Sequence, residues 1–272
     1  MFNVSKCAAL ALVGLTAISI SSCGSDNSRA EAAAQLLNQA DSLRQAGDCA
    51  GAIETINLLD SAYRDCLEQR RAARRLRAQV LYQVTIDSIE AFEEKSPAME
   101  AALDSLRPLF KKVELEGTEG YYVFKKSFTG SEMNRTGIQA RTDEKGYFFI
   151  AVSNTGRHIG LNALRYGSVQ TVAVESMDVA GSEIMSISQE AAADFAKAIM
   201  EAPAGKLKIE LLGTKNNVSI TLTAAEADAF RQTWRYSQLL QLYQLANVRR
   251  EKYERQRIAM SAMLDSIDAN QM

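Results

Sequence analysis

The C-terminal fifth of the chain carries an uninterrupted helical pattern, which places the strongest constraint on the fold. Thr223 and Glu226 have the spacing of a capping box and predict the start of a helix. Neither proline nor glycine follows them, so the helix is expected to run to about Asp268. Small or apolar residues recur at every seventh position as a coiled-coil-like seam: Leu239, Ala246, Tyr253, Met260 and Ile267. Because a lone helix cannot bury this stripe, it needs a partner, either the long N-terminal helix or a second copy.

Residues 29–113 are expected to form helices. Gly47 and Asp48 interrupt the first apolar stripe, since glycine suits a left-handed C-cap and aspartate suits an N-cap. Residues 41–54 surround this Gly-Asp turn and resemble one tetratricopeptide unit. Because stable arrays need about three such units, the resemblance implies a helical hairpin rather than a repeat array.

A long helix is predicted next, from Cys66 to Glu94. Ser96 and Pro97 are expected to break it, because serine caps helices and proline favours their first position. Pro108 is then expected to kink or end a further helix over 97–112.

Residues 114–222 change character and become rich in strand formers. Strands are expected at Tyr121–Phe124, Gly137–Thr142, Tyr147–Val152, Val169–Val174, Lys206–Leu211 and Val218–Leu222. The last two alternate between apolar and polar residues and predict a sheet with one buried face. An amphipathic helix is expected over Ser188–Glu201. The predicted fold class is α+β, with a stalk of N- and C-terminal helices and a central antiparallel β-rich module.

The N-terminus has the pattern of an export signal. Lys6 precedes the apolar run Cys7–Ile20, which is too short to span a hydrocarbon core of about 30 Å. The run Ile20-Ser21-Ser22-Cys23 at its end resembles the lipobox of bacterial lipoproteins. This resemblance implies a lipid on Cys23 and a cell-envelope location, at the periplasmic face of the outer membrane or the cell surface. The alternative is an ordinary secretory signal whose cleavage region contains a cysteine.

The chain is therefore expected to divide into five segments. In order, these are a signal peptide, a short polar tether, a helical region, a β-rich α+β module and a long C-terminal helix: residues 1–22, 23–28, 29–113, 114–222 and 223–272.

Composition excludes some partners. Lysine and arginine number 31 against 33 aspartates and glutamates, so no nucleic-acid partner is expected. Cys49 and Cys66 would lie about 25 Å apart on one unbroken helix, whereas a disulfide needs Cα atoms within about 7 Å. Two separate thiols are therefore favoured unless a helical hairpin intervenes. Their spacing does not fit a metal motif, and no cofactor or catalytic motif is recognised.

Four sets of residues are candidate sites. Two runs of basic residues stand out, and each is either a solvated helix face or a contact for anionic polymers or lipid headgroups. The first contains Arg70, Arg71, Arg74, Arg75 and Arg77, and the second contains Arg249, Arg250, Lys252, Arg255 and Arg257. Aromatic residues that fit a sheet core better than a ligand groove are Tyr121, Tyr122, Phe124, Tyr147, Phe148 and Phe149. His158, the single histidine, fits a surface residue.

The whole chain resembles uncharacterised lipoproteins of Bacteroidetes-type bacteria, in which a helical half precedes a small β-rich module. That resemblance implies an envelope location and no particular activity. The favoured function is a non-enzymatic scaffold or partner-binding protein, held to the membrane by its lipid and able to contact a partner or itself through its helices. Two alternatives are a periplasmic chaperone-like protein and a hydrolase or isomerase housed in residues 114–222.

Overall fold

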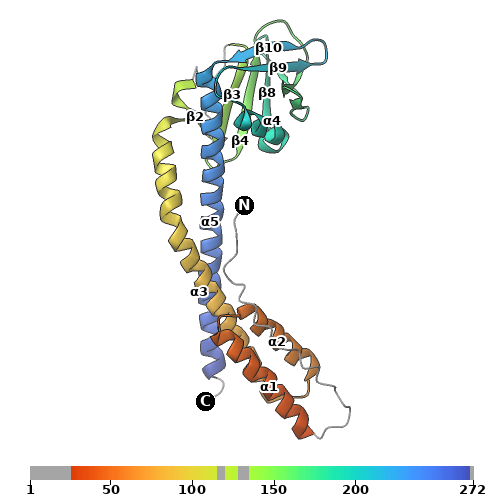
Figure 1. Cartoon of the computed structure of the whole chain (residues 1–272), viewed down its shortest axis with the longest axis vertical. Coiled ribbons are helices and arrows are strands. Elements are labelled where there is room, and N and C mark those ends of the chain that lie inside the picture. The colour runs from red at the N-terminus through yellow and green to blue at the C-terminus, as the bar shows by residue number, and fades with distance from the viewer. Residues whose placement is uncertain (1–25, 115–119, 128–134, 270–272) are drawn as a thin grey trace. The chain divides into compact units, whose positions relative to one another are not determined.

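The computed structural model describes residues 26–114, 120–127 and 135–269, and it has the expected α+β architecture (Figure 1). Two antiparallel sheets, three N-terminal helices and a long C-terminal helix are present. Backbone contacts divide the chain into a helical unit, Met1–Val84 with Ile258–Met272, and a sheet unit, Thr85–Arg257. Within the described ranges, no helix is both long and apolar enough to cross a membrane.

Four helical segments build the helical unit: α1 (Asp26–Gln45), α2 (Cys49–Ala62), the start of α3 (Leu67–Leu106) and the end of α5 (Ala224–Ala269). The Gly-Asp turn between α1 and α2 forms as predicted. Gly47 has a φ of +80°, and the Asp48 side chain accepts a hydrogen bond from the Gly51 amide. The core of this unit contains Ala40, Ile56, Leu59, Ala73 and Leu76.

Helix α1 begins at Asp26, so residues 26–28 of the expected tether are helical. The expected signal peptide and Cys23 lie outside the described residues. Cys49 opens α2 and Cys66 directly precedes α3, so the whole of α2 separates them. They are not joined in a disulfide, as the helical spacing predicts.

The predicted break at Ser96-Pro97 is wrong, because α3 continues through Pro97 to Leu106. A proline inside a helix leaves the carbonyl of the residue four positions earlier without its partner, here Glu93. Both Pro97 and Glu93 are exposed, so water can satisfy that carbonyl. Pro108 does end the helix, in the 3-10 turn Arg107–Leu109.

The sheet unit contains two antiparallel sheets, and Figure 1 labels most of their strands. The first has the order β1-β2-β3-β4-β8-β7, with bounds Phe110–Val113, Tyr121–Phe124, Gly137–Asp143, Phe148–Asn154, Ser182–Ser188 and Met177–Val179. The second has the order β10-β9-β5-β6, with bounds Val218–Leu222, Leu207–Gly213, Leu161–Tyr166 and Val169–Gln170.

Both predicted hairpins form. Strand β3 pairs with β4, and the Asp143 side chain closes their turn by accepting hydrogen bonds from the backbone amides of Lys145 and Tyr147. Strand β9 pairs with β10, with Leu207 opposite Leu222. The alternation of apolar and polar residues therefore identified the buried face of both β9 and β10 correctly.

The predicted strand Val169–Val174 is mostly wrong, because only Val169 and Gln170 are in β6. The next amides bond to different elements, with Thr171 donating to Leu164 of β5 and Val172 donating to Ala191 of α4. Because consecutive backbone N–H groups of this segment bond to two different elements, the segment cannot form a continuous ladder with one neighbouring strand, despite its strand-forming residues.

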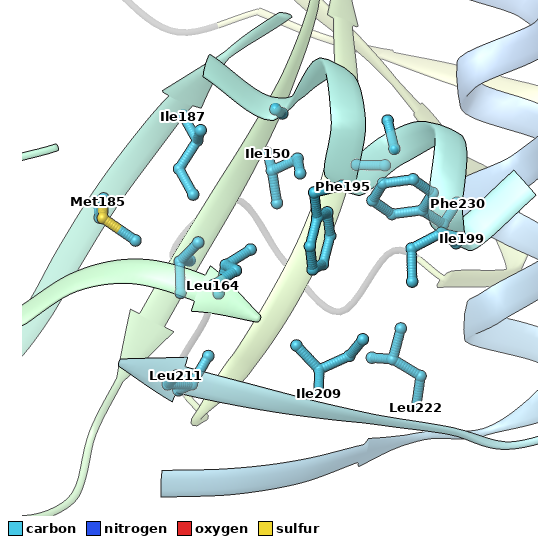
Figure 2. Close-up of a cluster of buried hydrophobic side chains, with 14 of the residues drawn as sticks. Ile150, Leu164, Met185, Ile187, Phe195, Ile199, Ile209, Leu211, Leu222 and Phe230 are labelled. Carbon is cyan, nitrogen blue, oxygen red and sulfur yellow. The ribbon is translucent and has the colours of Figure 1, made fainter. Parts of the chain in front are cut away.

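A single core fills the space between the two sheets (Figure 2). Ile150 and Ile187 from the first sheet and Ile209 from the second point into it. The expected amphipathic helix forms as α4 (Gln189–Glu201), with Ser188 as its N-cap, and adds Phe195 and Ile199. The first turns of α5 add Ala227 and Phe230.

In the sheet unit, α5 packs antiparallel to the second half of α3. Arg250 of α5 lies over the Phe92 ring of α3, and further along α3 Leu103 shares a cluster with Leu240 of α5. The predicted capping box is present, because the Thr223 amide donates to Glu226 and the Glu226 amide donates to Thr223 Oγ1. A coiled coil along the predicted seam stays a prediction.

Candidate functional site: an arginine-lined pocket

The helical unit contains a pocket of about 440 Å³ whose wall is dominated by arginine. Its lining residues come from the end of α2, the first turns of α3 and the end of α5: Asp60, Leu67, Arg70, Arg71, Arg74, Arg77 and Met263. Four guanidinium groups thus surround a single carboxylate, which makes the pocket strongly electropositive.

The helical repeat of α3 explains why the arginines gather. Leu67, Arg70, Arg71 and Arg74 follow the three- and four-residue spacing that places side chains on one face of a helix. On the opposite face, Ala73 and Leu76 pack against α1 and α2. The apolar face thus fixes α3, and its basic face is turned toward the pocket.

Asp60 orients two of the four arginines. One carboxylate oxygen accepts from Arg77 Nη2 at 2.8 Å, and the other lies 3.4 Å from Arg70 Nε. Asn57 Oδ1 accepts a further bond from Arg77 Nη1 at 2.8 Å. These side chains are about one-third exposed, so each ion pair contributes at most about 1 kcal/mol to folding. The main effect of Asp60 is to set the direction of the two guanidinium groups.

The other two arginines, Arg71 and Arg74, are exposed. Neither one forms an ion pair or a side-chain hydrogen bond with any residue of the described ranges. A guanidinium carries five N–H donors in a planar fork that matches carboxylate and phosphate oxygens. The pocket therefore offers two complete forks beside two that are already oriented.

Two apolar side chains complete the wall. Leu67 is 61% exposed and Met263 is 39% exposed, so both can contact an apolar part of a ligand. Leu67 is also the first residue of α3, so the positive end of the helix dipole adds to the arginine charge. The combination suits an anionic group that is attached to an apolar part.

The predicted basic residues outside the pocket include several that form ion pairs with acidic residues. Arg75 lies outside the pocket and donates two hydrogen bonds to Asp268 of α5, which raises the pKa of Arg75 and lowers that of Asp268. On the second run, Arg255 and Arg257 pair with Glu251 and Glu254 along α5. The second run therefore fits the simpler interpretation of a solvated helix face.

The predicted aromatic cluster is mainly sheet core. Tyr121, Phe124 and Phe148 are buried, whereas Tyr147 is exposed in the turn before β4. Phe148 packs edge-on against Trp234, with ring centroids 4.8 Å apart. The preference for a core over a ligand groove is confirmed for the three buried residues.

Beside His158, the sheet unit holds a buried carboxylate that sequence reasoning missed. Glu183 is 4% exposed, and its oxygens accept bonds from Asn154 Nδ2 and from the amides of Ile159, Gly160 and Leu161. Burial alone would raise the pKa of Glu183, but these four donors outweigh it and lower the pKa to about 2. Glu183 is thus fully engaged in holding the loop that leads into β5.

His158 lies at the edge of this arrangement. Its Nε2 is 3.5 Å from Asp178 Oδ2, and its Nδ1 is 4.0 Å from Glu183 Oε1. The ring is partly exposed. The described residues contain no group of three or more histidine, cysteine or acidic side chains that could hold a metal ion. The arrangement supports the expectation of a surface residue.

A smaller pocket of about 150 Å³ lies in the sheet unit, beside β3, β10 and the start of α5. Its two charged lining residues, Arg135 and Glu226, bond to each other at 2.6 Å. Their charges cancel, so this pocket has much less attraction for a charged ligand than the arginine-lined pocket.

The sequence revealed the arginines but not the full site. Asp60 and Met263 carry no local signal, because only the packing of α2 and α5 against α3 brings them to the arginines. Cys23, the predicted lipidation site, is outside the described residues. Comparison of the chain with protein-family models, curated proteins and solved structures finds no match.

Proposed function

We propose that this chain is a non-enzymatic protein that a lipid on Cys23 anchors to the cell envelope, and that its helical unit binds an anionic partner in the arginine-lined pocket. The observation that carries the proposal is the pair of uncommitted guanidinium groups, Arg71 and Arg74, beside the two that Asp60 orients. Charge-assisted bonds from such forks to phosphate or carboxylate are among the stronger polar contacts in proteins.

The chemistry of the pocket favours binding over catalysis. Its one carboxylate is engaged by Arg70 and Arg77, so it is poorly placed to act as a general base. The remaining lining groups are guanidinium, leucine and methionine side chains, none of which serves as a nucleophile. In the sheet unit, the buried carboxylate of Glu183 is likewise occupied by four donors.

Calorimetric titration with tripolyphosphate tests the proposal. The full chain, solubilised in a non-ionic detergent, is expected to bind this probe saturably, with an affinity that falls as salt rises. Replacing both uncommitted arginines, Arg71→Gln with Arg74→Gln, should weaken binding at least about tenfold, which corresponds to about 1.4 kcal/mol.

A matched control removes the same charge elsewhere. Arg249 and Lys252 are exposed on α5 and do not line the pocket. The double variant Arg249→Gln with Lys252→Gln should bind tripolyphosphate like the wild type. Equal weakening in both double variants would show that only overall charge matters, and the pocket would lose its proposed role.

A further inference from the structure

The arginine-lined pocket lies beside the turn between α2 and α3, and this turn is bonded to the start of α1. Arg29, in the first turn of α1, bonds to both carboxylate oxygens of Asp65 at 2.9 and 3.0 Å. It also donates to the Ala62 carbonyl at 3.1 Å, and its guanidinium lies over the Tyr63 ring. The turn between α2 and α3 is therefore held against the beginning of α1.

The same turn leads directly into the pocket. Asp60 lies just before it, near the end of α2, and Leu67 follows it as the first residue of α3. Both residues line the pocket, so the pocket opens beside the turn that Arg29 holds. The start of α1 and the pocket thus belong to one end of the helical unit.

Covalent length keeps this end near the predicted anchor. Helix α1 begins at Asp26, three residues after Cys23. A chain of three residues spans at most about 11 Å when fully extended. A lipid on Cys23 would therefore carry the first turn of α1 to the headgroup layer of the leaflet that holds it.

The pocket's chemistry matches what that layer presents. Phospholipid headgroups carry phosphodiesters, whose oxygens accept paired bonds from guanidinium forks. Next to each phosphate are the glycerol esters and then the apolar acyl chains, which the exposed Leu67 and Met263 side chains can contact. Basic groups beside an anionic leaflet strengthen a lipid anchor that is otherwise held only by its acyl chains.

We propose that the pocket binds the phosphate of anionic lipid headgroups in the same leaflet that holds the Cys23 lipid, and so attaches the helical unit to the membrane at a second point. Arg71 and Arg74 contact the phosphate oxygens, and Asp60 positions Arg70 and Arg77 behind them. This inference rests on the proposed function and names the anionic partner.

Native mass spectrometry of the detergent-solubilised full chain tests the inference. Separate samples receive phosphatidylglycerol, phosphatidylcholine or inorganic phosphate. We expect phosphatidylglycerol to remain bound at concentrations at least about tenfold below those needed for the other two, because only it combines net negative charge with an apolar part. The Arg71→Gln, Arg74→Gln variant should lose this preference, whereas the Arg249→Gln, Lys252→Gln control should keep it.

The possible failures are distinguishable. If tripolyphosphate and inorganic phosphate bind in the pocket but phosphatidylglycerol binds no better, the lipid inference is overturned and the proposed function stands. If the pocket variant retains phosphatidylglycerol like the wild type, the lipid binds elsewhere and the inference is again overturned. If no anion binds through the arginines, both proposals fail together.

Discussion

Asn154 and Glu183 are direct cross-strand partners on β4 and β8, and the Asn154 side-chain amide donates to the Glu183 carboxylate at 2.7 Å. The backbone amides of Ile159 and Gly160 in the loop after β4, and of Leu161 at the start of β5, complete the shell of this buried carboxylate. The shell joins the first sheet to the loop that enters β5 of the second sheet. A single glutamate therefore connects the two layers of the sheet unit.

This shell predicts acid sensitivity. The folded pKa of Glu183, about 2, is below its ordinary value of 4.5, so its stabilising effect is complete above about pH 4.5 and is lost as the pH falls toward 2. The shift corresponds to roughly 3 kcal/mol. Urea unfolding between pH 7 and pH 3, followed by the fluorescence of the single tryptophan, Trp234, should show this loss.

Glu183→Gln should remove most of that pH dependence and lower stability at pH 7, since an amide cannot accept all four bonds. Glu175→Gln, at an exposed position of the same unit, serves as the control and should leave the pH profile unchanged. An unaltered profile in the Glu183 variant would show that this carboxylate contributes little.

Gly146 should not tolerate a side chain. It has a φ of +90°, and an added Cβ would lie 2.6 Å from the Gln241 amide nitrogen and 2.9 Å from the Ser237 carbonyl oxygen of α5. Gly146→Ala is expected to cost about 2–3 kcal/mol in urea unfolding, through backbone strain and overpacking. Gly137→Ala, where a Cβ meets no atom within 4 Å, should cost far less. Similar costs at both positions would argue against close packing of the β3–β4 turn on α5.

Removing the pocket's carboxylate should strengthen anion binding. Asp60→Asn takes away the one negative charge of the pocket wall and weakens the hold on Arg70 Nε and Arg77 Nη2, so tripolyphosphate should bind about three- to fivefold more tightly at low salt. Asp41→Asn, which removes a half-buried ion pair with Arg44 outside the pocket, should leave the affinity for tripolyphosphate unchanged. Weaker binding in the Asp60 variant would mean that orientation of the two arginines matters more than net charge.

Cys23→Ala should abolish lipid labelling and release the protein from the membrane fraction, because the lipobox resemblance assigns the acyl chains to this thiol. Incorporation of labelled palmitate, followed by fractionation, measures both effects. The variant should still bind tripolyphosphate, since the pocket lies wholly within folded helices. Normal labelling of the variant would rule out Cys23 as the site.

The sequence predicted those elements whose signals are local. The Gly47-Asp48 turn, the Thr223–Glu226 capping box and the alternating arms of the β9–β10 hairpin all form. Strand β8 was missed because its inward positions are Glu183, Met185 and Ile187. A glutamate at an inward position hides the alternation, and only its tertiary donors make that burial possible.

Only part of the candidate site could be predicted from the sequence, because the rest depends on tertiary contacts. The arginines of α3 are neighbours along one helix, so their spacing is visible in the sequence. The sequence does not show whether this basic face is simply solvated or lines a pocket. The pocket also needs Asp60 of α2 and Met263 of α5, which are distant from the arginines along the chain. Pro97 is a third example, since its tolerance depends on the exposure of the carbonyl that it leaves unpaired.

The edge strands of the two sheets affect how readily the protein can pair with another chain. In the part of the chain that the structure describes, three of the four edge strands are unsuited to recruiting another chain. Strand β6 has two residues, β7 has three, and β1 exposes the consecutive residues Lys111 and Lys112. Short or lysine-bearing edges give a foreign strand little ladder to extend. Among the described strands, self-association into cross-β aggregates is therefore left with β10 as its main point of entry.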